Sequence, residues 1–200
     1  MNTNNIYLVN HRPKNCEPLM SITRLPKKEA FKLAKKLYEE NPCAAYRRFS
    51  SDFEFYYPER MNAEKWLYEK FIEIGGKPQT MHPIYFYVHG WDMVPKFWGD
   101  YKTIKLSLNE IDICDVSFTV GDSCGEHKRH GTMEIFLKDG LLKRISSFDN
   151  DVEKYIESVK QQIGNGIVEA QIWNDKYFLA GGTHFGLLGK SAFGLFDKPF

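Results

Sequence analysis

Serine, cysteine and histidine side chains gather in the run Gly-Asp-Ser-Cys-Gly-Glu-His-Lys-Arg-His at residues 121–130. Cys124, His127 and His130 follow at three-residue spacing, and both residue types bind zinc. The paired spacing of a zinc knuckle is missing, so we interpret the run as a charged loop and expect no metal. Ser123 is not part of a nucleophile elbow, because Gly-x-Ser-x-Gly does not occur there.

A second set of candidate residues is spread over three predicted strands. His11 follows the first strand, Tyr85 and Tyr87 lie in the middle one, and Glu169 lies in a late one. A carboxylate stabilises positive charge that develops on a substrate in the transition state. An aromatic face is suited to stacking on a planar ring. This chemistry requires His11 and Glu169 to share one cleft.

The order of these residues resembles the ADP-ribosyltransferase-like fold. In that family a His or Arg on an early strand holds the NAD ribose, and a Ser or Tyr on a middle strand lines the nicotinamide pocket. A Glu on a late strand orients the ribose hydroxyl and stabilises the oxocarbenium-like transition state. The resemblance implies that His11 and Arg12 bind NAD as substrate. It also implies a stacking wall at Tyr85 or Tyr87, and a catalytic carboxylate at Glu169.

The same resemblance has departures at two of its segments. Pro13 follows Arg12, where many family members have a small residue. Glu169-Ala-Gln171 reverses the Gln-x-Glu or Glu-x-Glu order often seen in the arginine-modifying branch. The resemblance covers three short segments rather than the whole chain.

A noncatalytic binding or regulatory protein is the alternative hypothesis. Aromatic residues make up 15% of the chain, and several of them crowd into residues 53–57. The C-terminal tail, residues 181–200, is rich in glycine and in large apolar side chains. A protein of this class would use an exposed apolar patch rather than a cleft.

The central strand of the predicted fold lies within residues 82–90. Ile84, Phe86 and Val88 alternate there with Tyr85 and Tyr87, which is the period of a strand, and both faces carry apolar groups. Alternation or β-forming residues predict further strands, and short turns suggest two hairpins, the first turning at 139–140. These strands are residues 6–10, 21–25, 103–108, 113–120, 132–137 paired with 141–145, and 167–173 paired with 176–179.

Helical periodicity predicts three main helices, at residues 26–41, 62–75 and 149–163. Pro26 is suited to the first turn of one helix, and Asn62 to the N-cap of the next. Residues 43–58 are expected to form a loop that packs its rings beneath itself. Residues 91–100 are expected to form a short helical turn or a loop.

These elements predict a single α+β domain over residues 1–180, with a mixed or largely antiparallel sheet and about three helices. The apolar tail is expected to dock on this domain or on a partner. The net charge of +1 argues against general nucleic-acid binding. No stretch has the length of a membrane span, and the cysteine pattern indicates a cytoplasmic protein with reduced thiols. The sequence leaves the oligomeric state open.

Overall fold

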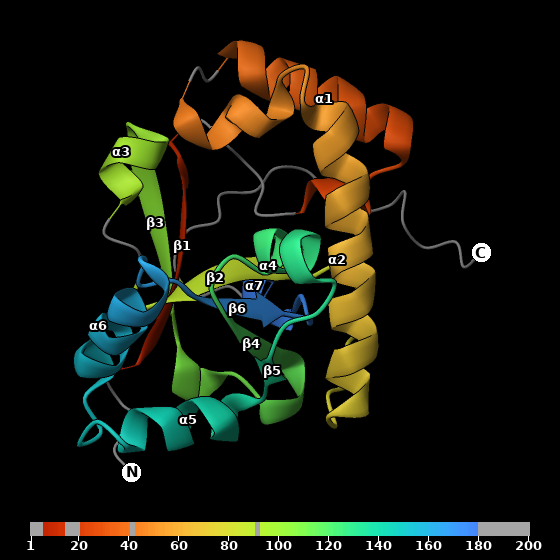
Figure 1. The fold of residues 1–200 in the computed structure, drawn as a ribbon. Helices are drawn as coiled ribbons and strands as arrows, with labels where there is room; N and C mark the ends of the chain where they lie inside the picture. The colour runs from red at the N-terminus through yellow and green to blue at the C-terminus, as the bar shows by residue number, and fades with distance from the viewer. Residues whose placement is uncertain (1–5, 15–20, 41–42, 91–92, 180–200) are drawn as a thin grey trace.

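The computed structural model describes residues 6–14, 21–40, 43–90 and 93–179. Its centre is a six-stranded antiparallel sheet in the order β3-β1-β2-β6-β4-β5 (Figure 1). The strands are β1 (Tyr7–Pro13), β2 (Ile84–Val88), β3 (Tyr101–Ser107), β4 (Val116–Val120), β5 (Ile135–Phe136) and β6 (Val168–Ile172). The expected α+β class with an antiparallel sheet is therefore confirmed.

Helices surround this sheet. The α-helices are α1 (Lys27–Glu40), α2 (Phe53–Glu73), α3 (Val94–Trp98), α4 (Ser123–His130), α5 (Lys138–Ser146), α6 (Val152–Ile163) and α7 (Lys176–Leu179). Short 3-10 helices are η1 (Ile22–Arg24), η2 (Ala44–Phe49), η3 (Leu108–Glu110) and η4 (Ile113–Asp115). The described residues thus contain seven α-helices, whereas the sequence indicated about three.

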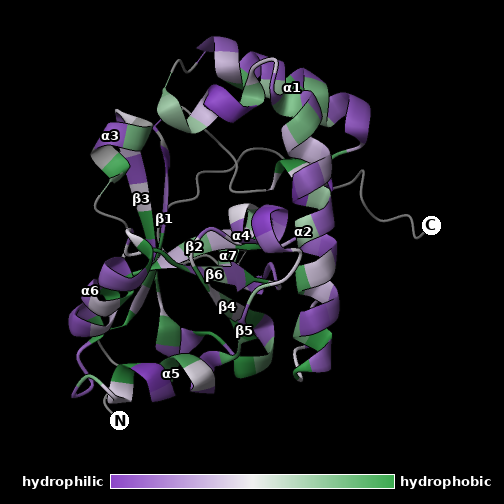
Figure 2. Ribbon diagram, viewed as in Figure 1, coloured by the Kyte–Doolittle hydropathy of each residue, from purple (hydrophilic) through white to green (hydrophobic). Residues whose placement is uncertain are grey.

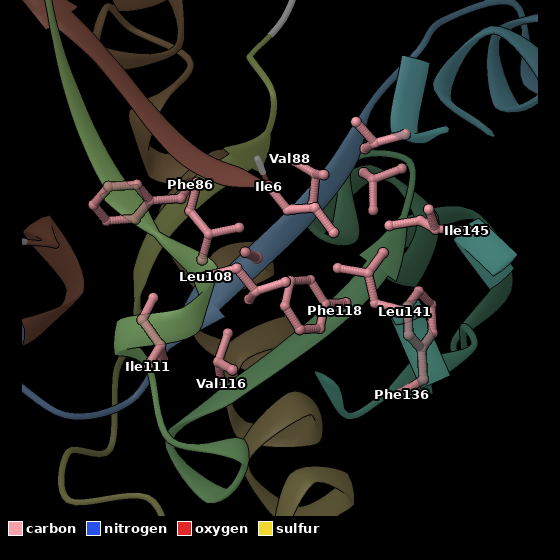
Figure 3. Close-up of a cluster of buried hydrophobic side chains, with 14 of the residues drawn as sticks. Ile6, Phe86, Val88, Leu108, Ile111, Val116, Phe118, Phe136, Leu141 and Ile145 are labelled. Carbon is pink, nitrogen blue, oxygen red and sulfur yellow. The ribbon is translucent and has the colours of Figure 1, made fainter. Parts of the chain in front are cut away.

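One face of the sheet carries the main hydrophobic core. Ile84, Phe86 and Val88 alternate onto this face, and all three are buried, as predicted. Side chains from α5 and α6 cover them, together with residues around η3 (Figure 3). The strand has β1 on one side and β6 on the other, so its central position is also confirmed.

The opposite face of the sheet is more polar, and α2 and α4 lie over part of it. Near one end of this face Trp173 stacks on Phe71 of α2, with ring centroids 5.3 Å apart, and closes a second apolar cluster with Leu67. Figure 1 shows α2 standing beside the sheet with α1 across its upper end. In Figure 2 the outward sides of the helices are mainly hydrophilic, while apolar residues concentrate between layers.

Helix α2 begins nine residues before the predicted start at Asn62, so the loop expected at 43–58 is wrong. It is η2 followed by the first turns of α2. Phe53 and Tyr57 lie on one side of these turns and pack against Ala30 and Ala34 of α1. Their burial outweighs the backbone hydrogen bond that Pro58 cannot donate inside the helix.

Residues 124–130, predicted as a loop, lie in helix α4. The Asp122 side chain accepts a hydrogen bond from the Cys124 backbone N–H, at 3.2 Å, and caps the first turn. Gly131 ends the helix with φ of 68°, a left-handed conformation that glycine adopts without a Cβ clash. The helix was not predicted because residues 123–130 are almost all polar and show no apolar periodicity.

Three further strand predictions are wrong. Residues 21–25 contain the short helix η1, residues 141–145 lie within α5, and residues 176–179 form α7. Leu141 and Ile145 are four residues apart, so a helix places both in the main core. In α7, Phe178 stacks on Phe86 at 5.9 Å between centroids. Packing therefore selected the helix for these short apolar segments.

Candidate functional site

His11, Tyr85, Tyr87 and Glu169 share one face of the sheet, which we call the polar face. Leu8 and Val88 are register partners and both belong to the main core, whereas Val9 is paired with Tyr87. Because side chains alternate along a strand, His11 lies on the same face as Val9. Glu169 is the register partner of Tyr87 on the next strand. The polar face therefore carries all four side chains on β1, β2 and β6.

Tyr87 lies between His11 and Glu169. Its ring stacks against the His11 imidazole with centroids 6.3 Å apart and an interplanar angle of 25°. Tyr101 of β3 meets the same imidazole edge-on at 5.6 Å. His11 and Glu169 thus belong to two strands that are separated by β2, roughly 10 Å apart at the backbone given the usual strand spacing.

The His11 imidazole is held neutral by its surroundings. Burial and the positive charge of Lys105 both lower its pKa. Its Nδ1 lies 3.2 Å from the Thr103 hydroxyl, whereas Nε2 is buried and has no hydrogen-bond partner among the residues that the structure describes. The ring therefore presents one unsatisfied nitrogen that can hydrogen-bond to a hydroxyl group.

Glu169 lies on β6, and its carboxyl group, which is 5% exposed, is buried beside the first residue of α4. Its Oε2 accepts a hydrogen bond from the Ser123 backbone N–H at 3.0 Å. Burial, with the negative charge of Asp122 added, raises its pKa to about 7, although Arg60 and the Ser123 hydrogen bond act in the opposite direction. A carboxyl group of this kind changes charge near neutral pH, as expected of a group in acid–base or electrostatic catalysis.

Two arginines, neither expected from the sequence, reach the polar face from the helical layer. The Arg60 guanidinium carbon lies 3.6 Å from the centroid of the Tyr85 ring, and Nε donates to Glu64 Oε1 at 2.8 Å. The Arg48 guanidinium lies over three rings, those of Phe49, Tyr56 and Phe97, at 5.6–5.9 Å. The only early signal was the Arg60–Glu64 spacing, which is typical of a helical ion pair.

Glu64 holds the Arg60 side chain in position. This carboxylate is fully buried and also accepts hydrogen bonds from the Thr23 hydroxyl and the His82 ring, each at 2.6 Å. Burial by itself would raise the pKa of Glu64, but the His82 contact, Arg60 and Thr23 outweigh it and lower the pKa. Glu64 therefore stays ionised and keeps the Arg60 side chain in place.

A ladder of buried polar groups fixes β4 against β6 beside the site. Gln171 accepts from the Ser117 hydroxyl at 2.9 Å and donates to Thr119 at 3.0 Å. The Trp173 ring N–H donates to Ser117 at 2.9 Å. Gln171 is thus committed to internal hydrogen bonds, while Glu169, on the same face, lies two residues nearer the start of α4.

Arg12 does not join His11 on the polar face. It follows His11 directly and pairs with Lys102, so the strand places it on the opposite side of the sheet. The Arg12 side chain is largely buried there, at 8% exposed. The pleat of β1 therefore separates the two residues that the resemblance grouped as NAD binders.

Cys124, considered above as a possible metal ligand, is buried in the first turn of α4. Burial raises the pKa of its thiol, although the neighbouring Arg60 acts against the rise. A protonated thiol is a weak nucleophile. Among the described residues no three His, Cys, Asp or Glu side chains are placed to hold one metal ion. His127 instead packs against Trp66, with ring centroids 6.0 Å apart.

The aromatic segment of the alternative hypothesis is mostly internal. Phe53 and Tyr57 are buried, at 3% and 8% exposed, and only Phe55 is well exposed among the rings of residues 53–57, at 71%. The tail at residues 181–200 lies outside the described residues. Within the described part of the chain, this segment therefore offers one exposed ring rather than an aromatic patch.

The polar face combines an ionisable carboxyl group, aromatic rings and two guanidinium groups. These groups can bind a planar, anionic molecule and stabilise positive charge beside Glu169. No helix in the described part of the chain has the length and apolar character to cross a membrane. The chain matches no protein-family model, no curated protein and no solved structure at a significant level.

Proposed function

We propose that the chain is an ADP-ribosyltransferase-like enzyme that binds NAD and breaks the bond between nicotinamide and ribose. The placement of His11, Tyr87 and Glu169 on one sheet face, with Tyr87 between the other two, carries this proposal. A shared sheet face is necessary for a histidine and a carboxylate to act in one cleft, and the strand register supports the proposal in this respect. A fold that put them on opposite sides would exclude the chemistry.

Each group has a role that follows from its surroundings. His11 is neutral and donates or accepts a hydrogen bond at a ribose hydroxyl through Nε2. Tyr87, or Tyr85 beside it, stacks on the nicotinamide ring. As the glycosidic C–N bond breaks, its electron pair moves to nicotinamide and positive charge develops on the ribose. The ionised Glu169 carboxylate stabilises that charge until a nucleophile adds at the same carbon.

The acceptor of ADP-ribose is the open part of the proposal. Gln171 is held in the buried ladder with Ser117 and Thr119, so it does not supply a free side chain beside Glu169. Water or a nucleophile brought by the acceptor molecule is the chemical class that the site requires. We therefore propose NAD as the substrate without assigning an arginine acceptor.

The test is nicotinamide release from NAD by the purified protein and by Glu169→Gln. The variant should bind NAD nearly as well but lose roughly 100-fold or more in turnover, because the carboxylate acts chiefly in the transition state. Glu157→Gln makes the same chemical change at an exposed position on α6 and should retain full activity. Undetectable nicotinamide release by the wild-type chain, with and without candidate acceptors, would favour the noncatalytic alternative.

A further inference from the structure

We propose that the guanidinium groups of Arg48 and Arg60 form an anion subsite beside the polar face, which binds the phosphate groups of a nucleotide. This inference deepens the proposed function, because NAD carries a diphosphate between its two nucleosides. It assigns residues of η2 and α2, and no residue of the three strands, to phosphate recognition. Its physical basis is that each guanidinium group is bonded through Nε, whereas its terminal nitrogens have no carboxylate partner among the described residues.

Arg48 has no carboxylate partner within 4 Å among the residues that the structure describes. Its Nε donates to the Ala45 carbonyl at 2.8 Å, and this bond leaves its terminal amino groups available. The rings of Phe49, Tyr56 and Phe97 surround the group and limit its access to water. Arg48 is half-buried and, among the described residues, no carboxylate contacts it directly, so the phosphate of a ligand would supply a close anionic partner.

Arg60 is held at one edge of its guanidinium. Glu64 binds its Nε at 2.8 Å, and the charge of Arg60 also lowers the pKa of the nearby Cys124 and Glu169 side chains against their burial. The Arg60 side chain is 11% exposed, and its printed ion pair uses Nε rather than the terminal nitrogens. A guanidinium fixed at one edge presents a forked donor that matches phosphate geometry.

The two arginines converge on the same place. Tyr56 lies one helical turn before Arg60 on α2, and its ring is 5.6 Å from the Arg48 guanidinium. The Arg48 charge is close enough to Tyr87 and Asp122 for both to raise its pKa, against burial and the like charge of Arg60. The Arg60 guanidinium lies 3.6 Å from the centroid of Tyr85, two residues before Tyr87 on β2, so the subsite adjoins the polar face and one bound dinucleotide would reach both places.

The experiment compares ligands with and without phosphate by isothermal titration calorimetry at low salt. Wild-type protein should bind ADP-ribose at least about tenfold more tightly than adenosine, as expected for a charge-assisted contact. Arg48→Met should remove this advantage and leave adenosine binding unchanged. Arg47→Met is the matched control, because it removes the same charge from the exposed neighbouring residue. Sodium sulfate should compete with ADP-ribose and not with adenosine.

Equal affinity of wild-type protein for ADP-ribose and adenosine, no binding of ADP-ribose, or equal effects of Arg48→Met and Arg47→Met would overturn the inference. If Arg48→Met does not fold, Arg48→Lys decides, since it keeps the charge but loses the fork and should bind ADP-ribose several-fold more weakly. An unchanged affinity in Arg48→Lys would then refute the subsite. If the Arg48 variants lose ADP-ribose binding and wild type releases no nicotinamide, the proposal of an NAD-cleaving enzyme fails, while the proposal of a phosphate-binding subsite is supported.

Discussion

The protonation of Glu169 is the residue-scale property on which the proposed chemistry depends. Burial and Asp122 raise its pKa to about 7, so the folded protein holds this carboxyl group partly protonated at neutral pH. The unfolded chain ionises it near 4.5, the ordinary value. Stability from this group is therefore fully present below pH 4.5 and is lost as pH rises toward 7. A site that costs stability at working pH is typical of functional residues.

Glu169→Gln should therefore stabilise the fold, by about 2–3 kcal/mol at pH 8. The gain should shrink to less than about 1 kcal/mol at pH 5, where the wild-type carboxyl group is already protonated in the folded state. Urea unfolding at the two pH values measures the difference, with Glu157→Gln as the control. A variant that is less stable than wild type at pH 8, or a gain in stability that does not depend on pH, would contradict a pKa of about 7 for buried Glu169.

The same group sets the pH dependence of the proposed activity. Only the ionised carboxylate stabilises a developing positive charge, and this form increases as pH rises through about 7. The rate at low NAD concentration should therefore climb from pH 6 to pH 8 and then level off. Burial keeps the pKa of Tyr85 and Tyr87 above 10, so neither phenol ionises in that range. A flat profile between pH 6 and pH 8 would separate turnover from Glu169.

At the scale of elements, β2 contributes to both layers of the molecule. Its even-numbered residues fill the main core, while Tyr85 and Tyr87 line the polar face. Phe86→Ala should lower the free energy of unfolding by about 3–5 kcal/mol, because the fully buried ring packs among core side chains and stacks on Phe178. Phe55→Ala removes the same group from a 71% exposed position and should change stability by less than about 0.5 kcal/mol.

Denaturant unfolding of the two variants gives a direct comparison of these positions. A loss below about 1 kcal/mol for Phe86→Ala would show that β2 is not the centre of a closed core.

The helices were harder to predict than this strand. The first turns of α2 and all of α4 lack a clear apolar stripe of their own, and contacts with α1 and with the sheet decide their conformation.

At the scale of the whole molecule, Arg24 ties together three distant parts of the chain. Its guanidinium donates to both carboxylate oxygens of Asp175 at 2.9 Å and to the His82 carbonyl at 2.9 and 2.7 Å. These contacts join η1 to the segments before β2 and before α7. Arg24→Ala should cost about 2 kcal/mol in stability, because several partly buried, charge-assisted hydrogen bonds are lost together.

Thermal or urea unfolding measures this cost, and Arg129→Ala is a suitable control because Arg129 is 59% exposed on α4. Equal stabilities of the two variants would show that the Arg24 contacts add nothing to the fold. A loss restricted to Arg24→Ala would show that the segments around residues 24, 82 and 175 stabilise one another through this side chain. The measurement does not depend on the proposed function.

The sequence by itself determined the period-2 pattern of β2 and the presence of strands around His11 and Glu169. Strand alternation is a local rule, and the register needed to place His11, Tyr87 and Glu169 on one face was consistent with it. The same rule, applied to β1, separates Arg12 from His11, although the resemblance had grouped them. The α+β class with a largely antiparallel sheet was also predicted, although the second strand of each hairpin that suggested it, residues 141–145 and 176–179, is helical.

Only the tertiary structure decided which strands are neighbours, how Arg48 and Arg60 reach the polar face, and that Glu169 is buried beside Asp122. Each of these depends on contacts between residues far apart in the chain, whose free energies exceed the local preferences of any short segment. Arg48 and Asp122 both lay in segments expected to be loops. Their chemical meaning arises because η2, α2 and α4 pack against the same face of one sheet.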